Sequence, residues 1–172
     1  MTSIREGNIV WTFPEGWYAE KYDDWEFYRN QFQKCADGNK AMDILALNSN
    51  EGEFWMIEAK DYRRNRRNPS KGPLPIEVAK KTRDTLAGVF AASTRAVSNE
   101  KSFAHRATNA KKIRVVLHLE QAKTPTKLFP LVVDPADAKQ KLKKLLKAID
   151  PRVTVMSTSA NRCPWTTQWA PQ

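Results

Sequence analysis

The chain has 172 residues, and 29 Lys and Arg against 19 Asp and Glu give it a formal net charge of +10 at pH 7. This length suits one domain with a substantial core, and 41% hydrophobic residues argue against disorder. A basic surface attracts anions, so we expect a polyanionic partner. From its length we expect a single domain over residues 1–172. Because the chain shows neither a membrane-spanning apolar run nor a secretory signal, we expect this domain in the cytoplasm and away from membranes.

Cysteine and histidine are scarce. Cys35 and Cys163 are too few for a disulfide scaffold or a zinc ribbon and fit a reducing compartment. With only His105 and His118, the chain offers few ligands for a histidine-based metal site and few residues for a histidine-dependent catalytic triad. We therefore interpret both histidines as structural or surface residues.

The first half of the chain is rich in strand-length apolar segments. Residues 9–13 predict a strand, whereas residues 17–33 fit either a helical stripe or a strand within one half. Residues 41–47 and 53–60 are both apolar, and the short polar stretch between them predicts a β-hairpin.

A long helix is expected after a loop at residues 61–75. We place it at residues 75–97, since proline is favoured at the first helical position. Its expected apolar face consists of Ile76, Ala79, Leu86, Val89, Phe90 and Val97.

The last third predicts three strands and one helix. The strands fall at residues 113–119, 128–133 and 153–156. Asp134 is a good cap for a helix that carries Ala138, Leu142, Leu145 and Ile149 at helical spacing. The tail holds Trp165 and Trp169, which either pack back on the domain or form an interface with another chain.

The hairpin places charged side chains together. If residues 49–52 form its loop, Asn48 faces Glu53 and Asp43 faces Glu58. Opposed carboxylates repel each other, so we expect a divalent cation between them. Lys60 emerges on the same face as Glu58, because side chains alternate along a strand.

Asp43 followed by Glu58-Ala59-Lys60 resembles the motif of the PD-(D/E)XK nuclease superfamily. The resemblance covers residues 41–60 and implies an α/β fold with a restriction-endonuclease-like αβββαβ core, a central mixed β-sheet flanked by helices. It implies a metal-dependent endonuclease or exonuclease that hydrolyses phosphodiester bonds, in DNA for most members.

The resemblance also assigns roles to these residues. Asp43, Glu58 and the backbone carbonyl of Ala59 would bind Mg²⁺ or Mn²⁺, and Lys60 would orient or deprotonate the attacking water. Members often add an acid from the first helix, for which Glu20 is favoured over Glu15, Asp23, Asp24 and Glu26. Met42 stands where the family often has proline.

A basic run follows the motif directly. Arginine side chains can grip phosphates, so we expect nucleic acid to contact Arg63, Arg64, Arg66, Arg67 and Lys71, with Lys80, Lys81 and Arg83 extending the surface. The lysines at positions 139, 141, 143, 144 and 147 are interpreted as the solvated face of the late helix. Seven early aromatic residues are interpreted as core, namely Trp11, Trp17, Tyr18, Tyr22, Trp25, Phe27 and Tyr28.

Two other functions remain open. The chain could be a catalytically silent nucleic-acid-binding or assembly subunit, or a basic module that binds an acidic protein. Because so small a domain has little room beyond a catalytic core, a homodimer or a partner subunit could supply specificity.

Overall fold

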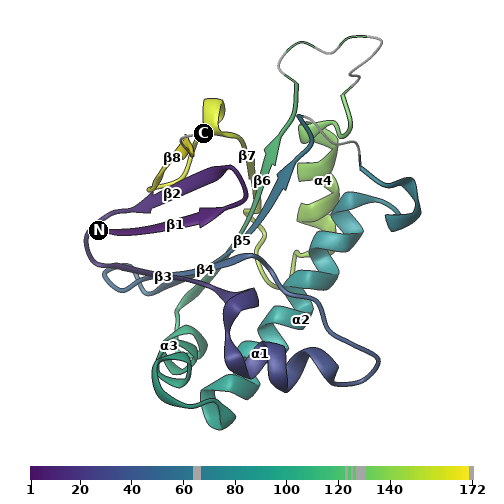
Figure 1. Ribbon diagram of the computed structural model, residues 1–172. Coiled ribbons are helices and arrows are strands. Elements are labelled where there is room, and N and C mark those ends of the chain that lie inside the picture. Colours follow the sequence, from purple (N-terminus) through teal and green to yellow (C-terminus); the bar gives the residue numbers. More distant parts are fainter. Residues whose placement is uncertain (64–66, 123, 125, 127–130, 171–172) are drawn as a thin grey trace.

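The protein is described by a computed structural model that covers residues 1–63, 67–122, 124, 126 and 131–170. Its elements form three layers: helices, a five-stranded sheet, and a three-stranded sheet (Figure 1). The five-stranded sheet is therefore covered on both faces, which explains the nearly continuous apolar sequence of its central strands.

The five-stranded sheet is mixed. Its strand order is β3 (Trp17–Lys21), β4 (Ile44–Asn48), β5 (Glu53–Asp61), β6 (Lys112–Glu120) and β7 (Thr154–Met156). The β3–β4 and β4–β5 pairs are antiparallel, whereas β5–β6 and β6–β7 are parallel. Because β5, β6 and β7 run in one direction, their carboxyl ends meet at the same edge of the sheet.

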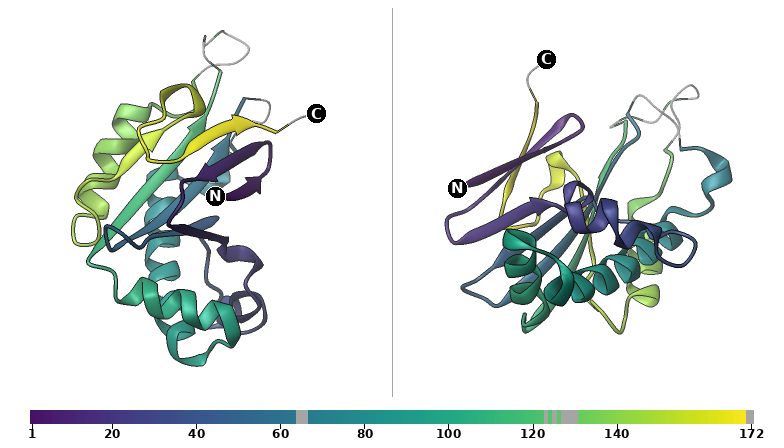
Figure 2. Two further views of the ribbon diagram at one scale, coloured as in Figure 1. Left: turned by 90° about the vertical axis from the view of Figure 1, so that its left-hand side faces the viewer. Right: turned by 60° about the horizontal axis from the view of Figure 1, so that its bottom comes forward.

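The helices cover one face of this sheet, as both views in Figure 2 show. They are α1 (Glu26–Asn30), α2 (Leu74–Arg95), α3 (Ser98–Thr108) and α4 (Pro135–Leu145), with short 3₁₀ turns η1 (Tyr22–Asp24), η2 (Phe32–Lys34), η3 (Pro69–Lys71) and η4 (Thr158–Ala160). As expected, Asp134 caps α4, since its side chain accepts from two amides of the first turn.

The three-stranded sheet covers the other face. It consists of β1 (Thr2–Glu6), β2 (Ile9–Phe13) and β8 (Thr166–Trp169), in the order β1-β2-β8. Trp165 packs against Phe13, Trp17 and Trp55, with ring centroids 5.1–5.7 Å apart. The tail thus packs back on the domain, and the early aromatic residues form core except Tyr18, which is exposed.

The predicted mixed α/β class is confirmed, with two sheets and four α-helices in the described part of the chain. The 17–33 segment contains both strand and helix, namely β3 and then α1. Of the strand expected at 128–133, residues 128–130 lie outside the described residues, and residues 131–133 form no strand. No helix in the described ranges is long and apolar enough to cross a membrane.

The expected apolar face of α2 was wrong in part. Val89 is buried, but Ile76 and Phe90 are exposed, and Val97 lies beyond the end of α2, where it is exposed too. The buried face instead includes Thr82 and Thr85. Their hydroxyls are satisfied within the core, because Thr82 donates to Val78 O and Thr85 accepts from Met42 N.

Candidate functional site

The β4–β5 hairpin has the predicted register. Asn48 faces Glu53 and Ile44 faces Ile57, so the residues that directly precede and follow, Asp43 and Glu58, are opposed. Asp43 continues the pairing, since its amide donates to Ile57 O at 3.1 Å. The Asp43 carboxylate also accepts from the amide of Ala59 at 2.7 Å, which fixes its position at the strand end.

Two lysines bind the opposed acids. Lys60 Nζ and Lys81 Nζ lie 2.5 and 2.6 Å from the same Glu58 oxygen, Oε1. Lys81 comes from α2, and its Nζ is also 3.6 Å from Asp43 Oδ1. Asp43, Glu58, Lys60 and Lys81, named here the acid–lysine cluster, therefore carry two acidic and two basic groups.

Glu58 is the fully buried acid of this cluster. Its side chain is 0% exposed, and Oε2 has no hydrogen-bond partner among the described residues. Burial raises the pKa of Glu58 to about 7, with a further contribution from the charge of Asp43, although Lys81 and Lys60 oppose the shift. Burial alone would lower the pKa of Lys60, but the Glu58 carboxylate outweighs it and raises that pKa.

The cluster extends along α2 through Glu77, one helical turn before Lys81. Lys60 Nζ is 3.5 Å from Glu77 Oε1, and Arg67 binds Glu77 Oε2 at 2.6 Å. Arg67 also donates to the Tyr62 hydroxyl and to Gly72 O. We expected this arginine to contact nucleic acid. In the structure its guanidinium instead holds the loop against α2.

The favoured N-terminal acid, Glu20, accepts from the indole of Trp25 at 2.8 Å. Asp23 instead lines a cavity together with Asp43 and Lys81. Its pKa is raised mainly by burial, and the charge of Asp43 adds to the shift. Asp23 was one of the sequence candidates, but the helical pattern did not distinguish it from its neighbours.

The predicted Mg²⁺ or Mn²⁺ site remains a prediction. Asp43 and Glu58 supply oxygen ligands of the type that Mg²⁺ prefers, and Glu58 Oε2 is a buried acceptor without a partner in the described part of the chain. Within those residues, however, no three His, Cys, Asp or Glu side chains are grouped to hold a metal. The catalytic roles of Asp43, Glu58 and Lys60 are untested in the same way.

The other expected nucleic-acid contacts are dispersed. Lys71 on η3 and Lys80 on α2 are exposed, and the Arg83 side chain is 71% exposed. Arg63 is held by Asp61 and lies over the Trp169 ring, 3.5 Å from its centroid. Arg64 and Arg66 lie outside the described residues.

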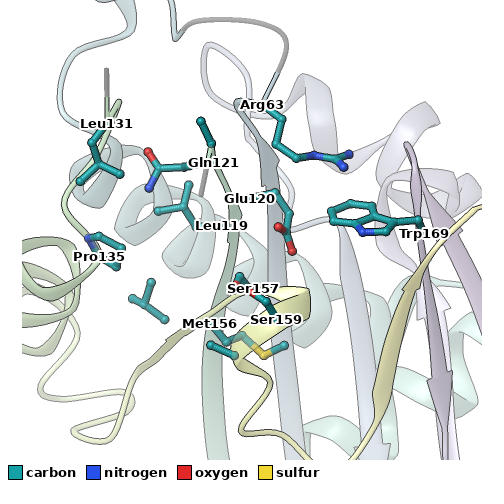
Figure 3. Close-up of a pocket in the computed structure, with 13 residues that line it drawn as sticks. Arg63, Leu119, Glu120, Gln121, Leu131, Pro135, Met156, Ser157, Ser159 and Trp169 are labelled. Carbon is teal, nitrogen blue, oxygen red and sulfur yellow. Dashed lines mark hydrogen bonds between the residues drawn. The ribbon is translucent and has the colours of Figure 1, made fainter. Parts of the chain in front are cut away.

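A second candidate site lies at the carboxyl ends of β6 and β7. It is a cavity of about 530 Å³, named here the β6–β7 cavity, bounded by Arg63 and Trp169 on one side and by Leu131 and Pro135 on another (Figure 3). Glu120 also lines it, and its carboxylate accepts from His118 Nε2 at 2.8 Å and from the amide of Thr158. Although burial opposes the shift, these hydrogen bonds lower the pKa of Glu120.

Sequence reasoning did not find this cavity. Trp169 was treated only as a tail residue, and Glu120 ends a strand with no motif around it. The aromatic ring and the basic run are far apart in sequence, and in the fold β8 pairs with β2 and Trp169 lies against Arg63.

The chain resembles a curated cysteine–tRNA ligase of Neisseria meningitidis serogroup A. The two are 33% identical over an alignment of 167 residues, which covers 80% of this chain and 24% of the ligase. The chain thus spans about a quarter of that protein's length. No family model matches the chain, and no solved structure matches it.

This resemblance corrects the expectations drawn from the Asp43 to Lys60 motif. Membership of the PD-(D/E)XK superfamily, the metal-dependent nuclease function, phosphodiester hydrolysis as endonuclease or exonuclease, and DNA as the partner are contradicted, because the similar protein is named as a tRNA ligase. The physical reason is that an acid followed by acid-x-Lys is a short pattern. A chain with 28% charged residues is expected to contain it about once by chance.

Proposed function

We propose that the chain is a tRNA-binding domain. The observation that carries the proposal is the 33% identity to a cysteine–tRNA ligase over 80% of the chain. The net charge of +10 supports it, since lysine and arginine contacts to phosphates supply much of the affinity of proteins for nucleic acids. Because the chain matches 24% of the ligase, the proposal concerns tRNA binding and not aminoacylation.

The proposed phosphate-binding surface consists of Lys80 and Arg83 on α2, which we name the α2 surface. Lys80 and Arg83 are three residues apart and therefore neighbours on the helix. Their exposed side chains can reach phosphates without breaking the core. Lys81 points inward to Glu58 instead and is a structural member of the acid–lysine cluster.

Charge reversal tests this assignment. In the double variant Lys80→Glu and Arg83→Glu, we expect the affinity for tRNA at moderate salt to fall about tenfold or more, and the salt dependence of binding to become shallower. Fluorescence anisotropy with labelled tRNA measures both quantities.

The matched control is Lys143→Glu on α4 combined with Lys147→Glu just after the end of α4, which makes the same change in net charge at two exposed positions. We expect a clearly smaller loss of affinity in the control. Equal losses in the two double variants would contradict the α2 surface, since they would show an effect of net charge alone.

A further inference from the structure

The β6–β7 cavity joins a stacking surface to a buried acceptor. Trp169 is 41% exposed, and the Arg63 guanidinium covers its ring with 3.5 Å to the centroid. Arg63 is held in this position, because it donates to both carboxylate oxygens of Asp61, at 2.9 and 2.6 Å. Aromatic rings and arginine planes are the surfaces on which proteins stack unpaired bases.

Next to Trp169 the cavity holds a carboxylate, which disfavours a bound phosphate (Figure 3). Glu120 supplies the one carboxylate among the described lining residues, and its side chain is 7% exposed. His118 and the Thr158 amide donate to it, so it remains an ionised acceptor. A carboxylate repels a phosphate group but accepts from the amino group of a base.

The dimensions of the cavity fit a nucleotide-sized ligand. Its volume of about 530 Å³ lies within the range typical of small-molecule sites. Figure 3 shows the Trp169 ring and the Glu120 carboxylate on neighbouring sides of this space, with apolar contacts from Leu119 and Met156 nearby. A flat ring can thus contact the indole while its polar edge faces Glu120.

We propose that the β6–β7 cavity binds one unpaired nucleobase of RNA that carries an exocyclic amino group, with its ring stacked against the Trp169–Arg63 pair and its amino group donating to Glu120. This inference rests on the proposed tRNA-binding function. It adds a base-binding subsite to the phosphate contacts of the α2 surface.

Substitution of Trp169 tests the stacking. Stacking on an aromatic side chain contributes roughly 1–3 kcal/mol per base, which corresponds to about 5- to 150-fold in affinity. We expect Trp169→Leu to weaken tRNA binding by at least about fivefold, whereas Trp169→Phe keeps affinity within about threefold because the aromatic ring is retained.

Tyr18 offers a matched control. Its exposed ring is also covered by an arginine, Arg106, at 4.0 Å, but it lies outside the cavity lining. We expect Tyr18→Leu to leave the affinity for tRNA unchanged. Circular dichroism of each variant reports whether it is folded.

Short single-stranded oligoribonucleotides test the amino group. We expect cytidine and adenosine oligomers to bind more tightly than uridine oligomers, and we expect Trp169→Leu to remove the difference.

The outcomes separate the two proposals. If wild-type protein binds tRNA but Trp169→Leu binds equally well, the nucleobase site is overturned while tRNA binding stands. Equal binding of uridine and cytidine oligomers would overturn the contact to Glu120. Absence of tRNA binding by wild-type protein would overturn the proposed function and the nucleobase site with it.

Discussion

Burial of the Glu58 carboxylate is the main electrostatic cost of the acid–lysine cluster. Its carboxylate is fully buried, one oxygen accepts from two ammonium groups, and the other has no partner among the described residues. Ion pairs with Lys60 and Lys81 compensate part of this cost, but burial dominates and raises the pKa of Glu58 to about 7. Glu58 is therefore the residue whose protonation couples most directly to stability.

The free energy of unfolding should decrease with pH in the window set by Glu58. Its pKa rises from 4.5 to about 7 on folding, so the folded state binds the proton more tightly. The stabilising contribution is complete below pH 4.5 and is lost as pH rises to about 7. We expect wild-type protein to lose up to about 3 kcal/mol relative to Glu58→Gln between pH 4.5 and 7.5.

Urea denaturation at several pH values measures this difference. Glu58→Gln removes the titrating group, so only the pH dependence of the difference between the two proteins is interpreted. A difference that stays constant or grows with pH would show that the two lysines outweigh burial.

At the scale of elements, α2 is the part that completes the cluster, because it presents Glu77 and Lys81 to the end of β5. Its close approach depends on Gly88. A Cβ atom built there would lie 2.0 Å from the Tyr22 hydroxyl oxygen and 2.9 Å from a ring carbon of Phe32. Both contacts are too short, so a side chain at this position would push α2 away from η1 and η2.

Gly88→Ala should accordingly destabilise the protein. In an unhindered helix the change would stabilise by roughly 1 kcal/mol, since alanine has the higher helix propensity. Here we expect a loss of about 1–3 kcal/mol from overpacking. Chemical denaturation measures whether the free energy of unfolding falls or rises in Gly88→Ala. As a control, Lys80→Ala on the exposed face of α2 should keep the free energy of unfolding within about 0.5 kcal/mol of the wild-type value. Stabilisation by Gly88→Ala would contradict the close packing.

Local patterns predicted some elements well and others poorly. The register that opposes Asp43 and Glu58 followed from two apolar strands and a short loop, and the Asp134 cap followed from its position before a helical pattern. The buried face of α2 did not follow, because Thr82 and Thr85 are polar residues whose burial depends on partners in other segments.

In the whole molecule, contacts between segments far apart in sequence determine which side chains meet at the two candidate sites, and local sequence patterns do not predict these contacts. β8 has little apolar alternation, and its pairing with β2 brings Trp169 over Arg63. Likewise, Lys81 reaches Glu58 only because α2 packs on the sheet. The motif correctly predicted which acids lie opposite one another, but the phosphodiester hydrolysis inferred from it is contradicted by the resemblance to a tRNA ligase.

The proposed tRNA-binding function is tested most directly by the equilibrium binding of tRNA to the whole chain in buffer with Mg²⁺. An excess of duplex DNA serves as competitor, and a denaturing gel then examines both nucleic acids. We predict that the protein binds tRNA despite the DNA, more weakly as salt increases, and that both nucleic acids remain intact. Preferential binding of the duplex, Mg²⁺-dependent cleavage of either nucleic acid, or no binding of tRNA at moderate salt would contradict the account.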